Sequence, residues 1–117
     1  MIHYVLPKDK ADREKPGFAA VDIPLPTRAF DMAEIRLTGR YPESGLVLNE
    51  QCDMVVRVLT GSVTFHREGE GILLSEGATV FVDKGRSYHW KPHVRVQLLV
   101  VSTPPWTPEQ HKRIPAP

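Results

Sequence analysis

Histidine is the residue type in this sequence that is best suited to acid–base chemistry. The chain has five histidines, and because imidazole titrates near neutral pH, each can give or take a proton under physiological conditions. His66 and His89 lie in apolar, strand-like segments and are the candidates for a general base. His93 and His111 lie in or beside proline-marked segments, and His3 lies near the N-terminus without an evident partner. No Ser-His-Asp signature, phosphate-binding loop or dinucleotide fingerprint accompanies them, so the residues do not decide whether the protein is an enzyme.

Cysteine offers little further chemistry. Cys52 is the only one, which excludes an internal disulfide and a cysteine-based zinc site. Glu50 and Asp53 flank it, and because nearby negative charge raises the pKa of a thiol, Cys52 is a poor nucleophile. A lone cysteine is typical of a reducing compartment, so we expect a cytoplasmic protein.

Proline and glycine divide the chain into a middle and two ends. None of the 11 prolines lies between residues 43 and 91, whereas six of the eight glycines do. Proline cannot donate a hydrogen bond to a central strand, while glycine suits tight turns. The middle is therefore predicted to be a compact sheet with glycine turns, flanked by extended arms.

Short runs of β-branched and aromatic residues, separated by glycine-bearing turns, predict strands through this middle. The expected strands are residues 31–38, 46–48, 54–59, 62–66, 72–74, 79–82, 87–90 and 94–98. Thr60-Gly61 and Glu68-Gly69 stand where hairpin turns are needed. Helix signals are scarce, apart from a turn at residues 108–112 with Thr107 as N-cap and Pro108 at the first helical position. The fold class is therefore all-β, an antiparallel sandwich or barrel of the jelly-roll kind.

Residue alternation predicts which side chains face the interior. Successive strand residues point to opposite faces, so Met54, Val56 and Val58 share the face opposite Arg57. By the same rule the even-numbered residues of 94–100 face inward, beginning with Val94. The opposite parity turns His89 outward. The predicted lining consists of Val47, Asn49, Met54, Val56, Val58, Tyr88 and Trp90.

This lining is mostly apolar but carries an amide, a phenol and an indole N–H. Such a mixture is typical of a small-molecule pocket, and we take Asn49, Met54, Val56, Tyr88 and Trp90 as the candidate ligand-binding residues. The same residues can instead fill a small core, with their polar groups satisfied by backbone or water. The sequence leaves both interpretations open.

The glycine spacing of the middle resembles the second sequence motif of the cupins. That motif reads Gly, five residues, Pro, one residue, Gly, two residues, His, three residues, Asn. Gly77 and Gly85 match its two glycines, while Asp83, Tyr88 and Pro92 hold the other three positions.

Three further features are similar to a group of small bacterial cupins: Arg-Tyr-Pro-Glu at 40–43, Asn49, and the proline-rich segment 103–110. The resemblance covers residues 31–105 and implies an RmlC-like antiparallel double-stranded β-helix, the cupin jelly-roll barrel. It implies one domain over residues 1–117, with an extended N-terminal arm (1–30), the barrel (31–105) and a C-terminal tail (106–117).

Metal-binding cupins hold a divalent ion with three histidines and one glutamate. The resemblance maps these four positions onto Val47, Asn49, Met54 and Tyr88, or, with an alternative spacing, replaces the first pair by Leu48 and Glu50. Only Glu50 is a strong ligand, because valine cannot ligate and thioether, amide and phenol groups bind divalent ions weakly. We therefore expect no cofactor.

A metal site with an altered ligand set is the alternative. A one-residue slip in the register would offer Asp53 or His89 as ligands. Strand alternation turns both outward unless a bulge re-aims them.

Charge and hydropathy exclude two classes of partner. With 15 basic and 14 acidic residues the net charge is +1, which lacks the basic excess that nucleic acids or anionic membranes attract. The longest aliphatic run is four residues, 98–101, far below the ~20 residues of a spanning helix.

The N-terminal arm contains two strand-like pieces, residues 2–6 and 18–23. We expect them to pair with a sheet edge, of the same chain or of a neighbour. Small cupins commonly form homodimers through a sheet face, and this resemblance implies Arg57, Arg95, Gln97 and Leu99 at or near such an interface.

Together these patterns predict a metal-independent cupin that binds a small molecule, as a sensor, a carrier, or a non-metal isomerase or lyase. A metal-dependent cupin enzyme with an altered ligand set and a structural dimeric barrel without a ligand are the alternatives.

Overall fold

Antiparallel β-strands account for nearly all the regular structure. The computed structural model describes all 117 residues and contains nine strands and one short 3-10 helix, η1. The elements are β1 (Arg13–Lys15), β2 (Phe18–Ile23), β3 (Asp31–Leu37), β4 (Leu46–Asn49), β5 (Asp53–Arg67), β6 (Glu70–Ser75), β7 (Thr79–Val82), β8 (His89–Thr103), η1 (Pro108–Gln110) and β9 (His111–Ile114). Every strand pair is antiparallel, which confirms the predicted fold class.

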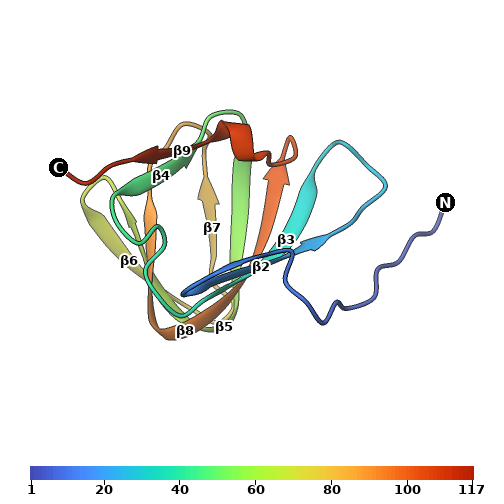
Figure 1. The fold of residues 1–117 in the computed structure, drawn as a ribbon, viewed down its shortest axis with the longest axis horizontal. Coiled ribbons are helices and arrows are strands. Elements are labelled where there is room, and N and C mark those ends of the chain that lie inside the picture. The colour runs from blue at the N-terminus through green and yellow to red at the C-terminus, as the bar shows by residue number, and fades with distance from the viewer.

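Two sheets enclose the interior. The larger sheet has the order β1-β2-β3-β8-β5-β6, with β7 also paired to β5, and the smaller consists of β4 and β9. In Figure 1 the small sheet lies at the top of the view, across the interior from β2. Isolated bridges from Tyr41 to Trp90 and from Val47 to Tyr88 link the β4 side to the start of β8. The cavity described below lies between these two sheets.

Two long strands, β5 and β8, replace four predicted short ones. The expected hairpin at Thr60-Gly61 is wrong, because β5 continues through these residues with shifts of register between Val58 and Thr60 and between Gly61 and Val63. Gly61 has a φ of 80°, so it bends the strand as part of a β-bulge. A positive φ serves a hairpin and a bulge equally well, which is why the residue alone misleads.

The same irregularity explains why Val94 does not face inward. Between the pairs Gly61–Val96 and Val63–Pro92, β5 contributes one residue and β8 contributes three. The extra residues of β8 leave the regular ladder, and Val94 is 80% exposed. The predicted alternation resumes at Val96, which is buried.

Other local signals give the expected structure. Glu68 and Gly69 both have positive φ (49° and 77°) and connect β5 to β6, as a two-residue hairpin turn with this geometry requires. Thr107 is the N-cap of η1, with Pro108 in its first turn. The turn ends at Gln110, two residues earlier than predicted, because residues 111 and 112 belong to strand β9, which is not predicted from the sequence.

The hydrophobic core draws residues from both sheets. Six of the seven residues predicted to face inward belong to the buried core cluster: Val47, Met54, Val56, Val58, Tyr88 and Trp90. The seventh, Asn49, is also buried, with 3% of its surface exposed.

The N-terminal arm is only partly strand. Its second piece forms β2, which pairs with β3 of the same chain along its whole length and confirms pairing with a sheet edge. Its first piece, residues 2–6, forms no strand, and Figure 1 shows this end running away from the sheets. The structure contains no helix of the length and hydrophobicity that crossing a bilayer requires.

We expect Gly61→Ala to destabilise the protein more than Gly69→Ala does. Both glycines have φ near 80°, where a side chain costs about 1–2 kcal/mol. At Gly61 a Cβ atom would also collide with the backbone carbonyl of Arg95, whereas at Gly69 nothing lies within 4 Å. Urea unfolding of the two variants compares their free energies of unfolding, and equal losses would contradict the close packing at the bulge.

Candidate functional site

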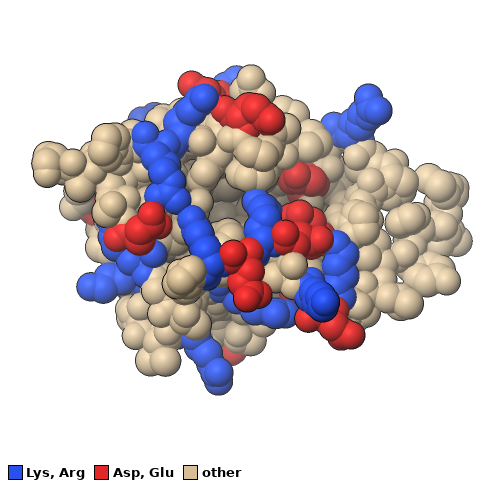
Figure 2. All heavy atoms as spheres, viewed as in Figure 1, with Lys and Arg blue, Asp and Glu red and all other residues tan.

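A cavity of about 100 Å³ lies between the two sheets. Twelve of its 17 lining residues are hydrophobic, and five of the seventeen are aromatic: Phe18, Tyr41, Tyr88, Trp90 and Trp106. Its polar lining residues are Arg13, Asp22, Asp31, Ser102 and His111. Figure 2 shows a hollow on the viewed face with acidic and basic side chains around it.

Four of the five candidate ligand-binding residues line this cavity. Met54 and Val56 reach it from β5, Trp90 from the start of β8, and Tyr88 from the position just before β8. Asn49 lies behind the wall, where its Nδ2 is 3.2 Å from the Met54 sulfur. The structure thus brings the five predicted residues together, although Asn49 contacts a lining residue, Met54, and does not itself line the cavity.

The Asn49 side chain is the centre of a hydrogen-bonded chain. Asn49 and His111 are register partners on β4 and β9, and Asn49 Oδ1 lies 2.7 Å from His111 Nδ1 and 3.0 Å from Trp106 Nε1. His111 Nε2 in turn lies 2.8 Å from the Tyr41 hydroxyl.

The direction of this chain follows from its chemistry. An indole N–H can only donate, so the Asn49 atom facing Trp106 must be the amide oxygen. That oxygen can only accept, so His111 carries its proton on Nδ1. In the neutral ring Nε2 is then an acceptor, and it receives the O–H of Tyr41.

Burial keeps both members of the Tyr41–His111 pair neutral at pH 7. Desolvation, reinforced by the positive charges of Arg113, Arg13 and Lys15, lowers the pKa of His111 to about 4. Desolvation also raises the pKa of the Tyr41 hydroxyl. The cavity therefore presents an uncharged imidazole bonded to an uncharged phenol.

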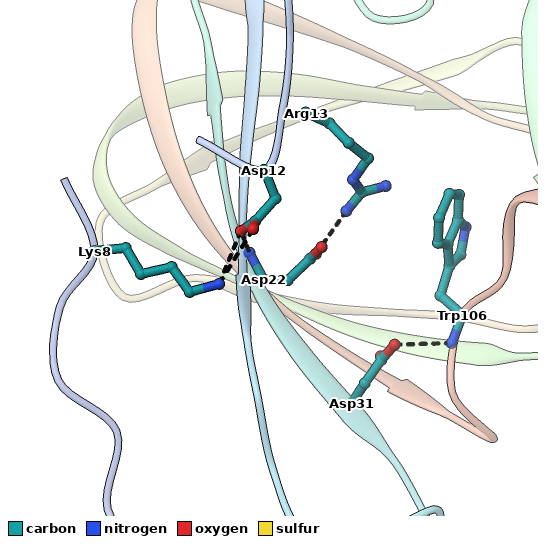
Figure 3. A network of polar contacts seen from close by, with 6 residues as sticks. All are labelled: Lys8, Asp12, Arg13, Asp22, Asp31 and Trp106. Carbon is teal, nitrogen blue, oxygen red and sulfur yellow. Dashed lines mark hydrogen bonds and ion pairs between the residues drawn. The ribbon is translucent and has the colours of Figure 1, made fainter. Parts of the chain in front are cut away.

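A second polar group comes from the arm and the strands beside it. Arg13 Nη2 lies 2.8 Å from Asp22 Oδ1, and the guanidinium carbon lies 4.6 Å from the centre of the Trp106 ring. Asp31 accepts the backbone N–H of Trp106 at 3.0 Å, and burial raises the pKa of this carboxyl. Figure 3 shows Arg13 reaching toward Asp22 with the indole ring beside it. The Nε of Arg13 is buried without a hydrogen-bond partner.

Lys8 and Asp12 hold the start of β1 in place beside this group. Lys8 Nζ lies 3.1 Å from Asp12 Oδ2, and the same oxygen accepts the backbone N–H of Asp22 at 2.7 Å. Figure 3 shows these contacts in line with the Arg13–Asp22 pair. They fix the position of Arg13 at the cavity.

Sequence reasoning missed most of the polar cavity residues. His111 follows a proline-marked turn, so the sequence favours His66 and His89 instead. Those two stack on each other, with ring centres 4.2 Å apart, on the opposite strand face from Phe65 and Trp90 of the core. Arg13 belongs to a three-residue strand with no pattern of its own. Only the pairing of distant segments brings these residues to the site.

The residues at the cupin metal-ligand positions do not fit a divalent ion. Met54 Sδ occupies the space between the Asn49 amide and the Tyr88 hydroxyl, at 3.2 Å and 3.9 Å, and Val47 offers no ligand atom. No group of three His, Cys, Asp or Glu side chains is placed to hold a metal. The alternative ligands point elsewhere.

Those alternative ligands have other contacts. Asp53 accepts the backbone N–H of Lys84 at 2.9 Å, and Glu50 lies 3.8 Å from Lys112 Nζ. Cys52 is buried, and burial raises the pKa of its thiol.

The chain resembles solved structures in fold, although no protein-family model matches it and no curated protein is significantly similar in sequence. The Streptomyces protein PAC13 with uridine has a TM-score of 0.82 at 10% identity, over 98% of this chain and 93% of that one. KdgF from Halomonas sp. has a TM-score of 0.76 at 12% identity, over 93% and 98%. An RmlC-like cupin from Shewanella frigidimarina has a TM-score of 0.72 at 13% identity, over 89% and 92%.

These similarities, together with the strand topology, define the class of protein. The chain has the fold of a small cupin domain, an RmlC-like antiparallel jelly roll. This confirms the resemblance drawn from the glycines of its second motif.

We expect His111→Gln to weaken the acid sensitivity of folding. His111 has an ordinary pKa of 6.5 when unfolded and a pKa of about 4 when folded. The unfolded chain therefore binds more protons in this window, and stability present above pH 6.5 is lost as the pH falls toward 4. A glutamine side chain cannot titrate, so the loss of Tm between pH 7 and pH 5 should be smaller in the variant.

His3→Gln is the matched control, because His3 is exposed and hydrogen-bonded to nothing in the core. It should keep the wild-type dependence. If His111→Gln also keeps it, His111 is not held neutral by the fold. Part of the dependence should remain in every variant, since burial also lowers the pKa of His89 to about 4.

Proposed function

We propose that the protein binds a small organic molecule in the cavity between its two sheets, without a metal ion. The observation that carries the proposal is the lining: five aromatic side chains together with the converging polar groups of Arg13, Tyr41 and His111. Apolar walls with a few fixed polar groups are the usual composition of ligand sites. A purely structural barrel would have no need of an open, charged rim.

The polar groups favour a ligand with both ring-like and polar parts. Phe18 and Tyr41 pack at 4.9 Å and Trp106 lies edge-on to His111 at 5.6 Å, so flat apolar surface is available. The Tyr88 hydroxyl lies 3.9 Å from the Met54 sulfur, a weak partner, and its other neighbour is the Asn49 side chain. Arg13 adds a positive charge at the rim.

One neighbour in fold has a small molecule in its solved structure. PAC13, whose structure holds uridine, is described as a nucleoside dehydratase. At about 10% identity that likeness carries the fold alone. The proposal is therefore a binding function, with the ligand defined by its chemistry as a small molecule that has a flat ring and polar substituents.

We also propose that two copies associate through the outer face of the large sheet. A row of apolar side chains crosses five strands there, and we call it the outer apolar row: Phe81, Val55, Val101, Met32 and Ile23. Phe81 is 58% exposed and Val55 39%, and exposed apolar patches commonly mark interfaces.

Charge beside the row favours self-association. On the same face of the sheet, two residues before Val101 on β8, Leu99 pairs with Arg57 on β5 and with Glu34 on β3. A two-fold axis near Leu99 would place Arg57 of each copy opposite Glu34 of the other, as a self-complementary interface requires. The resemblance to small cupins also predicts Arg57 and Leu99 at the interface.

Filling the cavity should abolish ligand binding while leaving the fold intact. A metabolite library screened by thermal shift identifies the ligand, and fluorescence of Trp90 and Trp106, the only two tryptophans, follows its binding. We expect Val100→Phe, which fills the cavity, to lose at least tenfold in affinity. Val94→Phe, on an exposed position, is the control and should bind normally. No stabilising compound, or equal binding by Val100→Phe, would refute the proposal.

Light scattering of the purified chain should give twice the 13.2 kDa mass of one copy. Phe81→Lys should shift this mass toward that of a monomer, because it buries a charge within the outer apolar row. Val94→Lys removes another exposed apolar side chain away from the row and should leave the dimer unchanged. A wild-type mass near 13.2 kDa would rule out the dimer.

A further inference from the structure

A second pocket lies apart from the cavity between the two sheets. It has a volume of about 70 Å³ and is bounded by the end of β5, the end of β7 and the loop that connects β7 to β8. Its seven lining residues are Phe65, Arg67, Phe81, Val82, Asp83, Arg86 and Ser87, and none of them lines the first cavity. Three of the seven are hydrophobic, so this pocket is more polar than the first.

The pocket contains hydrogen-bond donors that the protein itself does not use. Arg67 makes no ion pair, although Glu70 lies opposite it in the β5–β6 ladder. Arg86 uses one nitrogen, Nη1, for a bond of 3.0 Å to Glu68. Neither the hydroxyl nor the backbone N–H of Ser87 has a partner within the chain. Two guanidinium groups, a hydroxyl and an N–H are therefore available to a molecule that accepts hydrogen bonds.

The loop that carries Ser87 is held in place by backbone hydrogen bonds. Gly85 donates its N–H to the Asn49 carbonyl oxygen at 2.7 Å, and Arg86 donates its N–H to the Asp83 carbonyl oxygen at 3.2 Å. Gly85 has a φ of 79° in this turn. Because the loop backbone is already ordered, a molecule that binds to it causes little further loss of conformational entropy.

We propose that this second pocket binds inorganic phosphate. Guanidinium groups bind phosphate oxygens through two parallel N–H···O bonds, a geometry that a lysine ammonium cannot provide. Arg67, Arg86 and Ser87 line the same small pocket, so their donors can contact different oxygens of one tetrahedral anion. The proposal does not depend on the ligand of the first cavity, because the two pockets share no residue.

Asp83 determines which anion fits. Its carboxylate lines the pocket with the two arginines, and an ionised carboxylate can only accept hydrogen bonds. It repels an anion that carries no proton, such as sulfate, but it can accept the O–H that inorganic phosphate retains at neutral pH. A phosphate monoester has lost most of that proton at pH 7.5, since its second pKa is about 6. The lining therefore fits inorganic phosphate better than sulfate or a phosphate monoester.

The charges around the pocket favour a bound anion. Arg67 and Arg86 contribute two positive charges against one negative charge from Asp83. Glu68 is not a lining residue, and its ion pair with Arg86 is exposed, a kind of pair that adds little to stability. Phe65, which is buried, forms an apolar side of the pocket. Such a side lowers the local dielectric constant and strengthens the attraction between the arginines and an anion.

Amide NMR of the full chain, titrated with inorganic phosphate at pH 7.5 and constant ionic strength, tests the pocket. We expect phosphate to shift the signals of Arg67 and of residues 83–87, and sulfate and methyl phosphate to bind at least tenfold more weakly. Phe81 lines the pocket and also belongs to the outer apolar row. Light scattering in each anion therefore checks that the oligomeric state is the same in all titrations.

Arg67→Gln should weaken phosphate binding at least tenfold, because it removes one of the two guanidinium groups. Arg28→Gln is the matched control. It makes the same change in net charge at an exposed arginine without an ion pair, outside the pocket, and it should bind phosphate as the wild type does. The amide spectra of both variants also report whether they fold.

Asp83→Asn should bind sulfate at least tenfold more tightly than the wild type does, because the repelling charge is gone. The turn should persist, since it uses the backbone carbonyl of residue 83. The variant should therefore lose the preference for phosphate over sulfate while it keeps an anion site.

Absence of shifts at residues 67 and 83–87 in phosphate overturns the proposal. Equal losses in Arg67→Gln and Arg28→Gln also overturn it, because binding would then follow net charge alone. Equal affinity of the wild type for phosphate and sulfate, or no gain of sulfate binding in Asp83→Asn, overturns the identification of the ligand as inorganic phosphate. Tryptophan fluorescence reports on the first cavity separately, so these outcomes leave the proposed function standing.

Discussion

The buried amide of Asn49 is the interaction on which the site depends. Its oxygen accepts hydrogen bonds from His111 on β9 and from the Trp106 indole in the loop before η1. With 3% of the residue exposed, no water replaces a lost partner, and an orphaned buried donor costs about 1–3 kcal/mol. Together with the β4–β9 ladder, this amide holds the C-terminal segment against β4, so that Trp106 and His111 line the cavity.

The same amide determines the chemistry that the walls present. Because it accepts from Nδ1, the other nitrogen of His111 faces Tyr41 and the cavity as an acceptor. Burial and the neighbouring cations keep that ring neutral.

Local patterns predict the strands but not how they pair over long distances. The alternation of Met54, Val56 and Val58 and the glycine of the 68–69 turn lead to correct predictions, because both depend only on neighbouring residues. Gly61 misleads, since a positive φ fits a bulge as well as a hairpin. The positions of His111 and Arg13 could not be predicted, because they depend on pairing with β4 and β2. The residues of their own short segments do not indicate which strands they pair with.

The central claim is that the fold holds His111 neutral with its proton on Nδ1. Nitrogen-15 NMR of the two ring nitrogens at pH 7, assigned by comparison with His111→Gln, tests it directly. The account predicts a protonated Nδ1 and a Nε2 with the shift of an unprotonated, hydrogen-bonded nitrogen. An imidazolium, or a proton on Nε2, would contradict it.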